Sequence, residues 1–138
     1  MPADTVAVAK AVLQHLNKWD DKPCRFALEE LPQRAPALML QSQSSSGVLR
    51  SYVSGTFIGV YSFAIYYRAD MTDNETRLSA YETLERLADW LKTGDLPELG
   101  GNRQALKIEL TATPSLAQID DDIEDYQAIF SLQYKQLY

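Results

Sequence analysis

The sequence has few of the residues on which most enzymes and metal sites depend. Among its 138 residues there is one cysteine, Cys24, and one histidine, His15. A single cysteine excludes an intrachain disulfide and leaves too few ligands for a zinc cluster. A nucleophilic cysteine also needs a base within hydrogen-bond reach, and His15 is the sole histidine that could serve. We therefore expect neither an enzyme nor a protein that carries a metal or a cofactor.

Three kinds of segment are also missing. No apolar run approaches the ~20 residues needed to span a bilayer, and the first residues lack the basic and apolar regions of a signal peptide. No phosphate-binding loop is present, because the lysine and helix start that it requires accompany neither glycine pair, Gly55/Gly59 or Gly100/Gly101. No basic face suggests sequence-specific contact with nucleic acid. We expect a soluble protein made in a reducing cytoplasm and not bound to a membrane.

What the sequence does have is an uneven distribution of charge, with a formal net charge of −6. Residues 1–70 hold seven Lys and Arg against six Asp and Glu, whereas residues 71–138 hold six against thirteen. The densest acidic segment is 120–125, which contains Asp120, Asp121, Asp122, Glu124 and Asp125.

This acidic segment has several interpretations. Its spacing lacks the Asp-x-Asp-x-Asp-Gly pattern and the distal glutamate of an EF-hand calcium site. Paired carboxylates also serve glycosidases, but no cleft-forming aromatic motif accompanies them. The remaining alternatives are a solvated acidic loop and an acidic surface that faces a polyanion without retaining it.

Hydrophobic periodicity predicts the secondary structure. Apolar residues recur at helical spacing over residues 5–19 and 73–92. Alternation of apolar and polar or of β-branched and aromatic residues predicts strands over 60–68, 106–113 and 126–134. Two further strands are expected at 37–43 and, returning after a polar turn, at 48–54. A short strand at 24–28 is also compatible with the sequence.

The connections follow from turn-forming residues. The polar segment Gln43, Ser44, Ser45, Ser46 and Gly47 is typical of a hairpin tip between the first two predicted strands. Pro114 is expected to end a strand, so that residues 115–125 form a connection. The order is then α-β-β-β-α-β-β in a single domain, 1–138. It predicts an α+β fold, with two main helices packed on a mixed or antiparallel sheet of about five strands.

Three stretches of the chain together resemble a known family. They are YVSGTFIG at 52–59 with FAIYYR at 63–68, LERLADWL within 80–91, and IELTATP at 108–114 followed by YQAIFSLQYK at 126–135. With these motifs the chain resembles the small minor capsid or tail-terminator (tail-completion) proteins of siphophages and prophages. The similarity covers residues 5–137 in the order of elements, and its motifs are structural rather than catalytic.

The resemblance implies a non-enzymatic protein of the virion tail or neck, assembled in the cytoplasm of a bacterial host. Such proteins form a homo-oligomeric ring, typically a hexamer, that caps the major tail-tube protein and meets the head-closure or connector protein. DNA passes through the lumen without specific binding. Residues Asp120–Asp125 and the segment Gln43–Gly47 are then the candidates for contacts with the lumen or with partners.

Two alternatives stay open. Another neck or tail-tube component would have a similar fold, but a tube protein polymerises into long filaments, whereas a terminator stops at one ring. A small α+β enzyme or ligand-binding domain is the alternative from a different class. It would require a deep pocket with converging polar groups and carboxylates of perturbed pKa.

Overall fold

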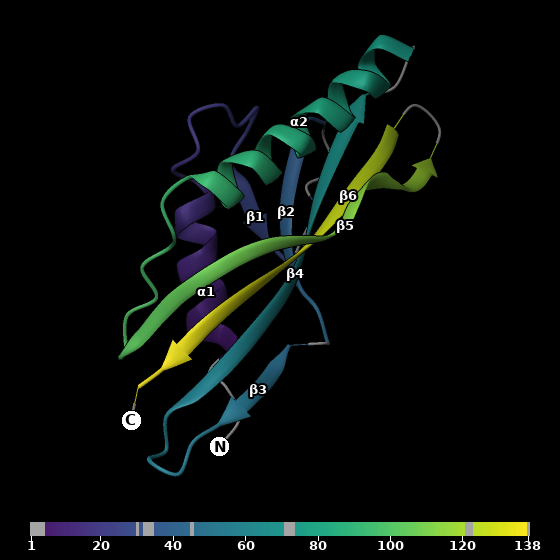
Figure 1. The fold of residues 1–138 in the computed structure, drawn as a ribbon. Coiled ribbons are helices and arrows are strands. Elements are labelled where there is room, and N and C mark those ends of the chain that lie inside the picture. The colour runs from purple at the N-terminus through teal and green to yellow at the C-terminus, as the bar shows by residue number, and fades with distance from the viewer. Residues whose placement is uncertain are drawn as a thin grey trace.

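The protein is an elongated α+β molecule in which two helices pack on one sheet (Figure 1). The structure, a computed structural model, describes residues 5–29, 31, 35–44, 46–70, 74–120 and 123–137. Its elements, in chain order, are α1 (Thr5–Leu16), β1 (Phe26–Leu28), β2 (Ala37–Ser42), β3 (Gly47–Ser51), β4 (Phe57–Asp70), α2 (Asn74–Thr93), β5 (Arg103–Asp120) and β6 (Ile123–Gln136). The predicted fold class is confirmed, with both helices and the short strand β1 present.

The sheet is mixed and has six strands, in the order β1-β2-β4-β6-β5, with β3 also paired to β4. β1 and β2 are parallel, and the other pairs are antiparallel. β4 and β6 are paired from Phe57↔Gln136 to Asp70↔Ile123, which makes them the central pair of the sheet.

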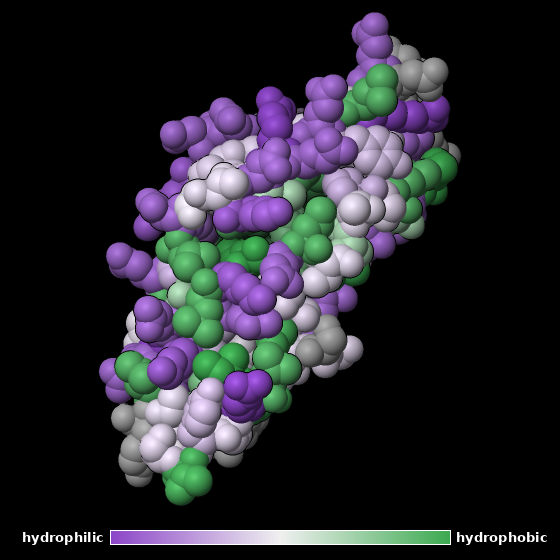
Figure 2. Space-filling model, in the orientation of Figure 1, coloured by the Kyte–Doolittle hydropathy of each residue, from purple (hydrophilic) through white to green (hydrophobic). Residues whose placement is uncertain are grey.

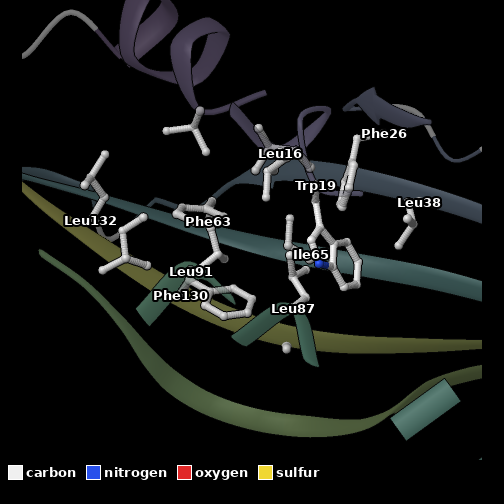
Figure 3. Packing of buried hydrophobic residues seen from close by; sticks show 14 of the residues in the cluster. Leu16, Trp19, Phe26, Leu38, Phe63, Ile65, Leu87, Leu91, Phe130 and Leu132 are labelled. Carbon is white, nitrogen blue, oxygen red and sulfur yellow. The ribbon is translucent and has the colours of Figure 1, made fainter. Parts of the chain in front are cut away.

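The core lies between the helices and one face of this central pair. Alternate residues of β4 and β6 are buried there, as the period of two in a strand requires: Tyr61, Phe63 and Ile65, and Tyr126, Ala128, Phe130, Leu132 and Tyr134. Figure 3 shows Leu16 at the end of α1, Trp19 just after it, and Leu87 and Leu91 of α2 converging on Phe63, Ile65 and Phe130. The apolar stripe on each helix therefore faces the sheet.

The first helix is shorter than its apolar pattern predicts, because it ends at Leu16 rather than near residue 19. The amides of Lys18 and Trp19 donate to the carbonyls of His15 and Leu16, three residues back, which tightens the last turn. This turn directs Trp19 inward, where its ring lies 6.3 Å from that of Trp90 in α2. Neither α1 nor α2, the helices of the described part of the chain, is a candidate for crossing a membrane.

The predicted hairpin around the Ser-rich segment is wrong. β2 pairs with residues 63–68 of β4, and β3 pairs with residues 57–60 of the same strand. Both are antiparallel to β4, so they run in one direction along the same edge. The segment 43–46 therefore joins two strands end to end instead of reversing the chain.

The true hairpin joins β3 to β4. The amide of Tyr52 donates to the Thr56 carbonyl at 2.8 Å, and the amide of Gly55 donates to the Tyr52 carbonyl at 3.0 Å. Gly55 has φ +94°, a conformation that glycine adopts at low cost. Gly55 therefore lies in the turn of this hairpin.

The prediction that Pro114 ends a strand is also wrong, because β5 continues to Asp120. β5 lies at the edge of the sheet, where a missing N–H is tolerated. The proline also falls at an irregularity, between Ala112↔Ile129 and Ser115↔Gln127. Consequently residues 115–120 and 123–125 form the outer part of a long β5–β6 hairpin rather than a loop.

Candidate functional site

The acidic segment lies at the outer end of the β5–β6 hairpin. Asp120 is the last residue of β5, and Glu124 and Asp125 lie near the start of β6. Asp121 and Asp122 lie outside the described residues. Adjacent residues of a strand point to opposite faces, so Glu124 points toward the helices and Asp125 toward the other face of the sheet.

Asp125 forms a bidentate ion pair with Arg68, its direct neighbour on β4. Arg68 Nε donates to Asp125 Oδ1 at 2.8 Å, and Arg68 Nη2 donates to Oδ2 at 3.0 Å. Asp125 is 6% exposed. Two parallel charge-assisted bonds offset the cost of burying the carboxylate, and they also fix the pairing of the two strands.

Glu124 anchors the start of α2. Its Oε1 accepts hydrogen bonds from Arg77 Nη2 at 3.0 Å and from Arg77 Nε at 3.3 Å. Its Oε2 accepts a hydrogen bond from the hydroxyl of Tyr126. The Tyr126 bond and the Arg77 guanidinium lower the pKa of the Glu124 carboxyl. Burial and the adjacent Glu124 raise the pKa of the Tyr126 hydroxyl.

These contacts correct the interpretation of residues 120–125 as one solvated acidic loop. Glu124 is only 3% exposed, and both it and Asp125 are paired within the chain. Their carboxylates bind arginines of the same chain and do not face an outside partner. Among the described residues no group of three or more His, Cys, Asp and Glu side chains could hold a metal ion.

The Ser-rich segment is held against the sheet rather than projecting from it. Ser46 Oγ accepts a hydrogen bond from the Ser62 amide at 2.8 Å and donates one to the Ser62 carbonyl at 3.2 Å. The Gln43 amide donates to the same carbonyl at 2.8 Å. The Ser46 side chain thus forms the two hydrogen bonds to Ser62 that the backbone of a neighbouring strand would otherwise form. Gln43, Ser46 and Gly47 therefore do not form a hairpin tip. Ser44 is exposed, and Ser45 lies outside the described residues.

The single histidine and cysteine do not form a nucleophilic site. His15 is buried at the end of α1 and stacks on Trp90, with ring centroids 4.8 Å apart. Burial lowers the pKa of its imidazole, and burial raises the pKa of the Cys24 thiol. A neutral thiol is a weak nucleophile, so Cys24 has the opposite of the activation that catalysis requires.

The grooves in the described surface are also unlike an active site. One lies between α2 and β5 and is lined by Ala88, Asp89, Lys92, Ile108, Glu109 and Leu110. All but Ala88 and Ile108 are exposed. Ligand pockets are concave, largely enclosed and mostly apolar. This groove is a depression in the surface.

Sequence reasoning missed a different feature, the apolar β3–β4 hairpin. Leu49 is 60% exposed, Val48 and Tyr52 are each 45% exposed, and Val53 in the turn is fully exposed. The signal was present in the sequence, because glycine favours a turn at residue 55 and Val53 lies two residues before it. The wrong hairpin assignment at 43–47 concealed it.

Comparison with known proteins gives information on the fold. No model of a known family matches the sequence, and no curated protein matches it. The fold is similar to that of a chain in a solved structure described as the virion of a native gene transfer agent (GTA) particle. The TM-score is 0.67 at 12% sequence identity, and the similarity covers 96% of this chain and 98% of that one.

Proposed function

We propose that this chain is a structural protein of a phage-like virion, forming a ring that caps the tail tube and joins it to the head connector. The observation that carries the proposal is the fold similarity, which extends over nearly the whole of both chains, to a component of a gene transfer agent virion. The tail-terminator resemblance of residues 52–68, 80–91 and 108–135 supports the narrower assignment.

The physical character of the molecule supports a role in assembly rather than in catalysis. Its buried carboxylates are paired with arginines, and its histidine packs on a tryptophan. Its outer strands and exposed apolar residues offer surfaces for other chains. A homo-oligomeric ring, a hexamer by resemblance, needs such surfaces because its contacts join two different patches of each copy.

The acidic turn of the β5–β6 hairpin fits a protein through which DNA passes. Glu124 and Asp125 pair with Arg77 and Arg68, and we propose the other members of the segment, Asp120, Asp121 and Asp122, as contacts with the lumen or a partner. A negative wall does not retain a duplex through its phosphates. The Ser-rich segment around Ser44 is the second proposed contact. It lies along an edge of the sheet.

The test is the addition of the purified protein to growing tail tubes of the same particle, observed by negative-stain electron microscopy. We expect one ring at one end of each tube and an arrest of elongation. The other neck or tube role, which fits the same virion similarity, predicts continuous filaments of this chain instead. No binding to tubes and no ring would contradict the proposal.

A control uses the head-closure protein of the same particle. Tubes capped by this chain should bind it, whereas uncapped tubes should not. Equal binding to capped and uncapped tubes would leave no joining function for the ring.

A further inference from the structure

Two apolar surfaces lie toward opposite ends of the sheet. The hairpin patch consists of Val48, Leu49, Tyr52 and Val53 on β3 and the β3–β4 turn. The edge patch consists of Leu110, Leu116 and Ile119 on the outer half of β5. In Figure 2 hydrophobic side chains reach the surface at both ends of the molecule, near the β3–β4 turn and near the end of β5.

Each patch lies on an outer strand of the sheet. β3 pairs with the beginning of β4, and β5 pairs with β6 on the far side of the sheet. Leu110, Leu116 and Ile119 lie opposite Phe130, Tyr126 and Glu124 of β6, all of which point toward the helices. The three side chains therefore form one row on the helix side of β5. Rows of exposed apolar side chains on outer strands favour association with another chain.

The two ends also differ in charge. Residues 43–67, which include β3 and most of β4, contain one charged residue, Arg50. Arg103 and Lys135 lie at the same end of the sheet, where they stand opposite Gln136 and Gln104 in the β5–β6 ladder. The opposite end carries Asp120 together with the adjacent Asp121 and Asp122 of the sequence. A single copy thus presents two apolar surfaces. The hairpin patch has basic neighbours in the sheet, and the edge patch has acidic neighbours in the sequence.

We propose that the hairpin patch of one copy docks on the edge patch of the next copy. The occupant is a second copy because the same chain supplies both apolar surfaces with opposite neighbouring charges. Two different patches make the contact heterologous, and a heterologous contact closes into a ring when its rotation permits. The inference rests on the proposed ring and identifies the surface that forms it.

The irregular edge of β5 indicates how the contact is made. The ladder to β6 shifts at four places, between Ala105/Lys107, Leu110/Ala112, Ala112/Ser115 and Leu116/Gln118, and Pro114 lies among them. Such irregularities prevent long strand-to-strand pairing. Side-chain packing of Val53 and Leu49 against Leu116 and Ile119 therefore carries the contact.

The test uses one variant of each patch. The hairpin variant is Leu49→Asp with Val53→Asp, and the edge variant is Leu116→Asp with Ile119→Asp. Each should raise the dissociation constant for self-association at least about tenfold, because desolvated apolar contacts dominate such interfaces. Analytical ultracentrifugation measures the association, and circular dichroism with thermal melting verifies that each variant is folded. Leu78→Asp is the matched control, since Leu78 is 62% exposed on α2 and belongs to neither patch.

Mixing the two variants gives a sharper result. The intact hairpin of the edge variant can dock on the intact edge of the hairpin variant, but no further copy can be added. We expect a dimer in the mixture and monomers in each separate sample. Monomers in the mixture, or full assembly of either variant alone, would overturn the inference.

A cross-linking measurement covers the case in which the aspartate variants fail to fold. In a Cys24→Ser background, Val53→Cys with Ile119→Cys should give a ladder of disulfide-linked copies on mild oxidation. Leu78→Cys with Ile119→Cys should give no ladder. A ladder from the second pair, or none from the first, would contradict docking of these two patches.

The outcomes separate this inference from the proposed function. If hairpin variants still form rings but no longer cap tail tubes, the hairpin faces the tube, and the inference is wrong while the ring stands. If the wild-type protein forms no ring either alone or on tubes, the proposed function fails as well.

Discussion

Arg68 and Asp125 show at the scale of single residues how the acidic segment is used. The pair is mostly buried, with side-chain exposures of 20% and 9%. Truncation of one partner leaves the other buried charge uncompensated, which costs more than the net contribution of the intact pair. The Asp125 carboxylate near the start of β6 thus holds β4 and β6 in register.

We therefore expect Arg68→Ala to lower the free energy of unfolding by about 2–3 kcal/mol. Urea denaturation measures the change. The double variant Arg68→Leu with Asp125→Leu should be less destabilised than Arg68→Ala, because no charge is stranded. Lys107→Ala is the control, since the Lys107–Glu109 pair is 52% and 55% exposed, and its loss should cost below about 1 kcal/mol. Equal losses at both pairs would contradict a structural role for Arg68.

His15 makes the stability of the fold depend on pH near neutrality. Burial and the nearby Lys18 lower the pKa of its imidazole, and Asp95 partly opposes them. Below the ordinary histidine pKa of about 6.5, the unfolded chain therefore binds a proton that the folded chain does not bind. Stability should consequently fall as the pH decreases from about 6.5 toward the lowered folded pKa, with a slope of at most ~1.4 kcal/mol per pH unit.

The substitution His15→Phe tests this pH dependence, because phenylalanine retains the stacking on Trp90 without titrating. Unfolding free energies at pH 7.5 and 5.5 should differ in the wild type and differ less in the variant. His15 is the single histidine of the chain, so no second imidazole obscures the comparison. The same slope in both proteins would assign the effect to other groups.

At the scale of elements, β4 and β6 are closely packed where Gly59 lies under the ring of Tyr134. A Cβ at residue 59 would overlap the Tyr134 ring, whereas a Cβ at Gly47 would meet nothing within 4 Å. Gly59→Ala should destabilise the protein by about 1–3 kcal/mol through overpacking, and Gly47→Ala should change stability by less than about 0.5 kcal/mol. Thermal melting of both variants measures this. Similar melting temperatures would mean that the Tyr134 ring moves aside freely.

The elements themselves were predicted from sequence better than their connections. The alternation in β4 and β6 and the stripe in α2 reflect burial on one face, and one-sided burial has a local period. Pairing between β2, β3 and β4 has no such local signal. Ser44–Ser46 has a composition typical of turns, but Ser46 bonds to Ser62, 16 residues away.

The candidate site shows the same limit. Asp120–Asp125 is visibly acidic, but the arginines that neutralise Asp125 and Glu124 are 57 and 47 residues distant in the sequence. The prediction that Pro114 ends a strand was wrong for a related reason, because the effect of a proline depends on whether its strand lies at an edge of the sheet. Long-range partners decide both outcomes, and one sequence contains no direct record of them.

At the scale of the whole molecule, the separation of charge along the sheet should govern assembly and DNA transfer. Replacing Asp120, Asp121 and Asp122 by Lys should leave the melting temperature nearly unchanged, because the two buried, paired carboxylates of the segment, Glu124 and Asp125, are retained. Association between copies should become slower, and particles carrying the variant should deliver less DNA. Stopped-flow scattering and transfer assays measure the two effects.

The matched control reverses the same amount of charge elsewhere. Glu82 and Glu85 are exposed on α2, and Glu98 is exposed after it. Their replacement by Lys should leave association and transfer close to wild type. Unfolding on replacement of Asp120, Asp121 and Asp122 by Lys would show that the three aspartates are structural. Unchanged association and delivery would show that they are merely solvated.

The bond between Ser46 and Ser62 has a consequence for amide hydrogen exchange. The Ser62 amide lies in the middle of β4, yet its acceptor is a side-chain hydroxyl, which a single rotation about one bond can remove. The Ser62 amide proton should therefore exchange with deuterated solvent sooner than the amide protons of Phe63 and Ile65, without global unfolding. Ser46→Ala should accelerate that exchange further. The junction between β2 and β3 is therefore a site of local opening in an otherwise continuous sheet.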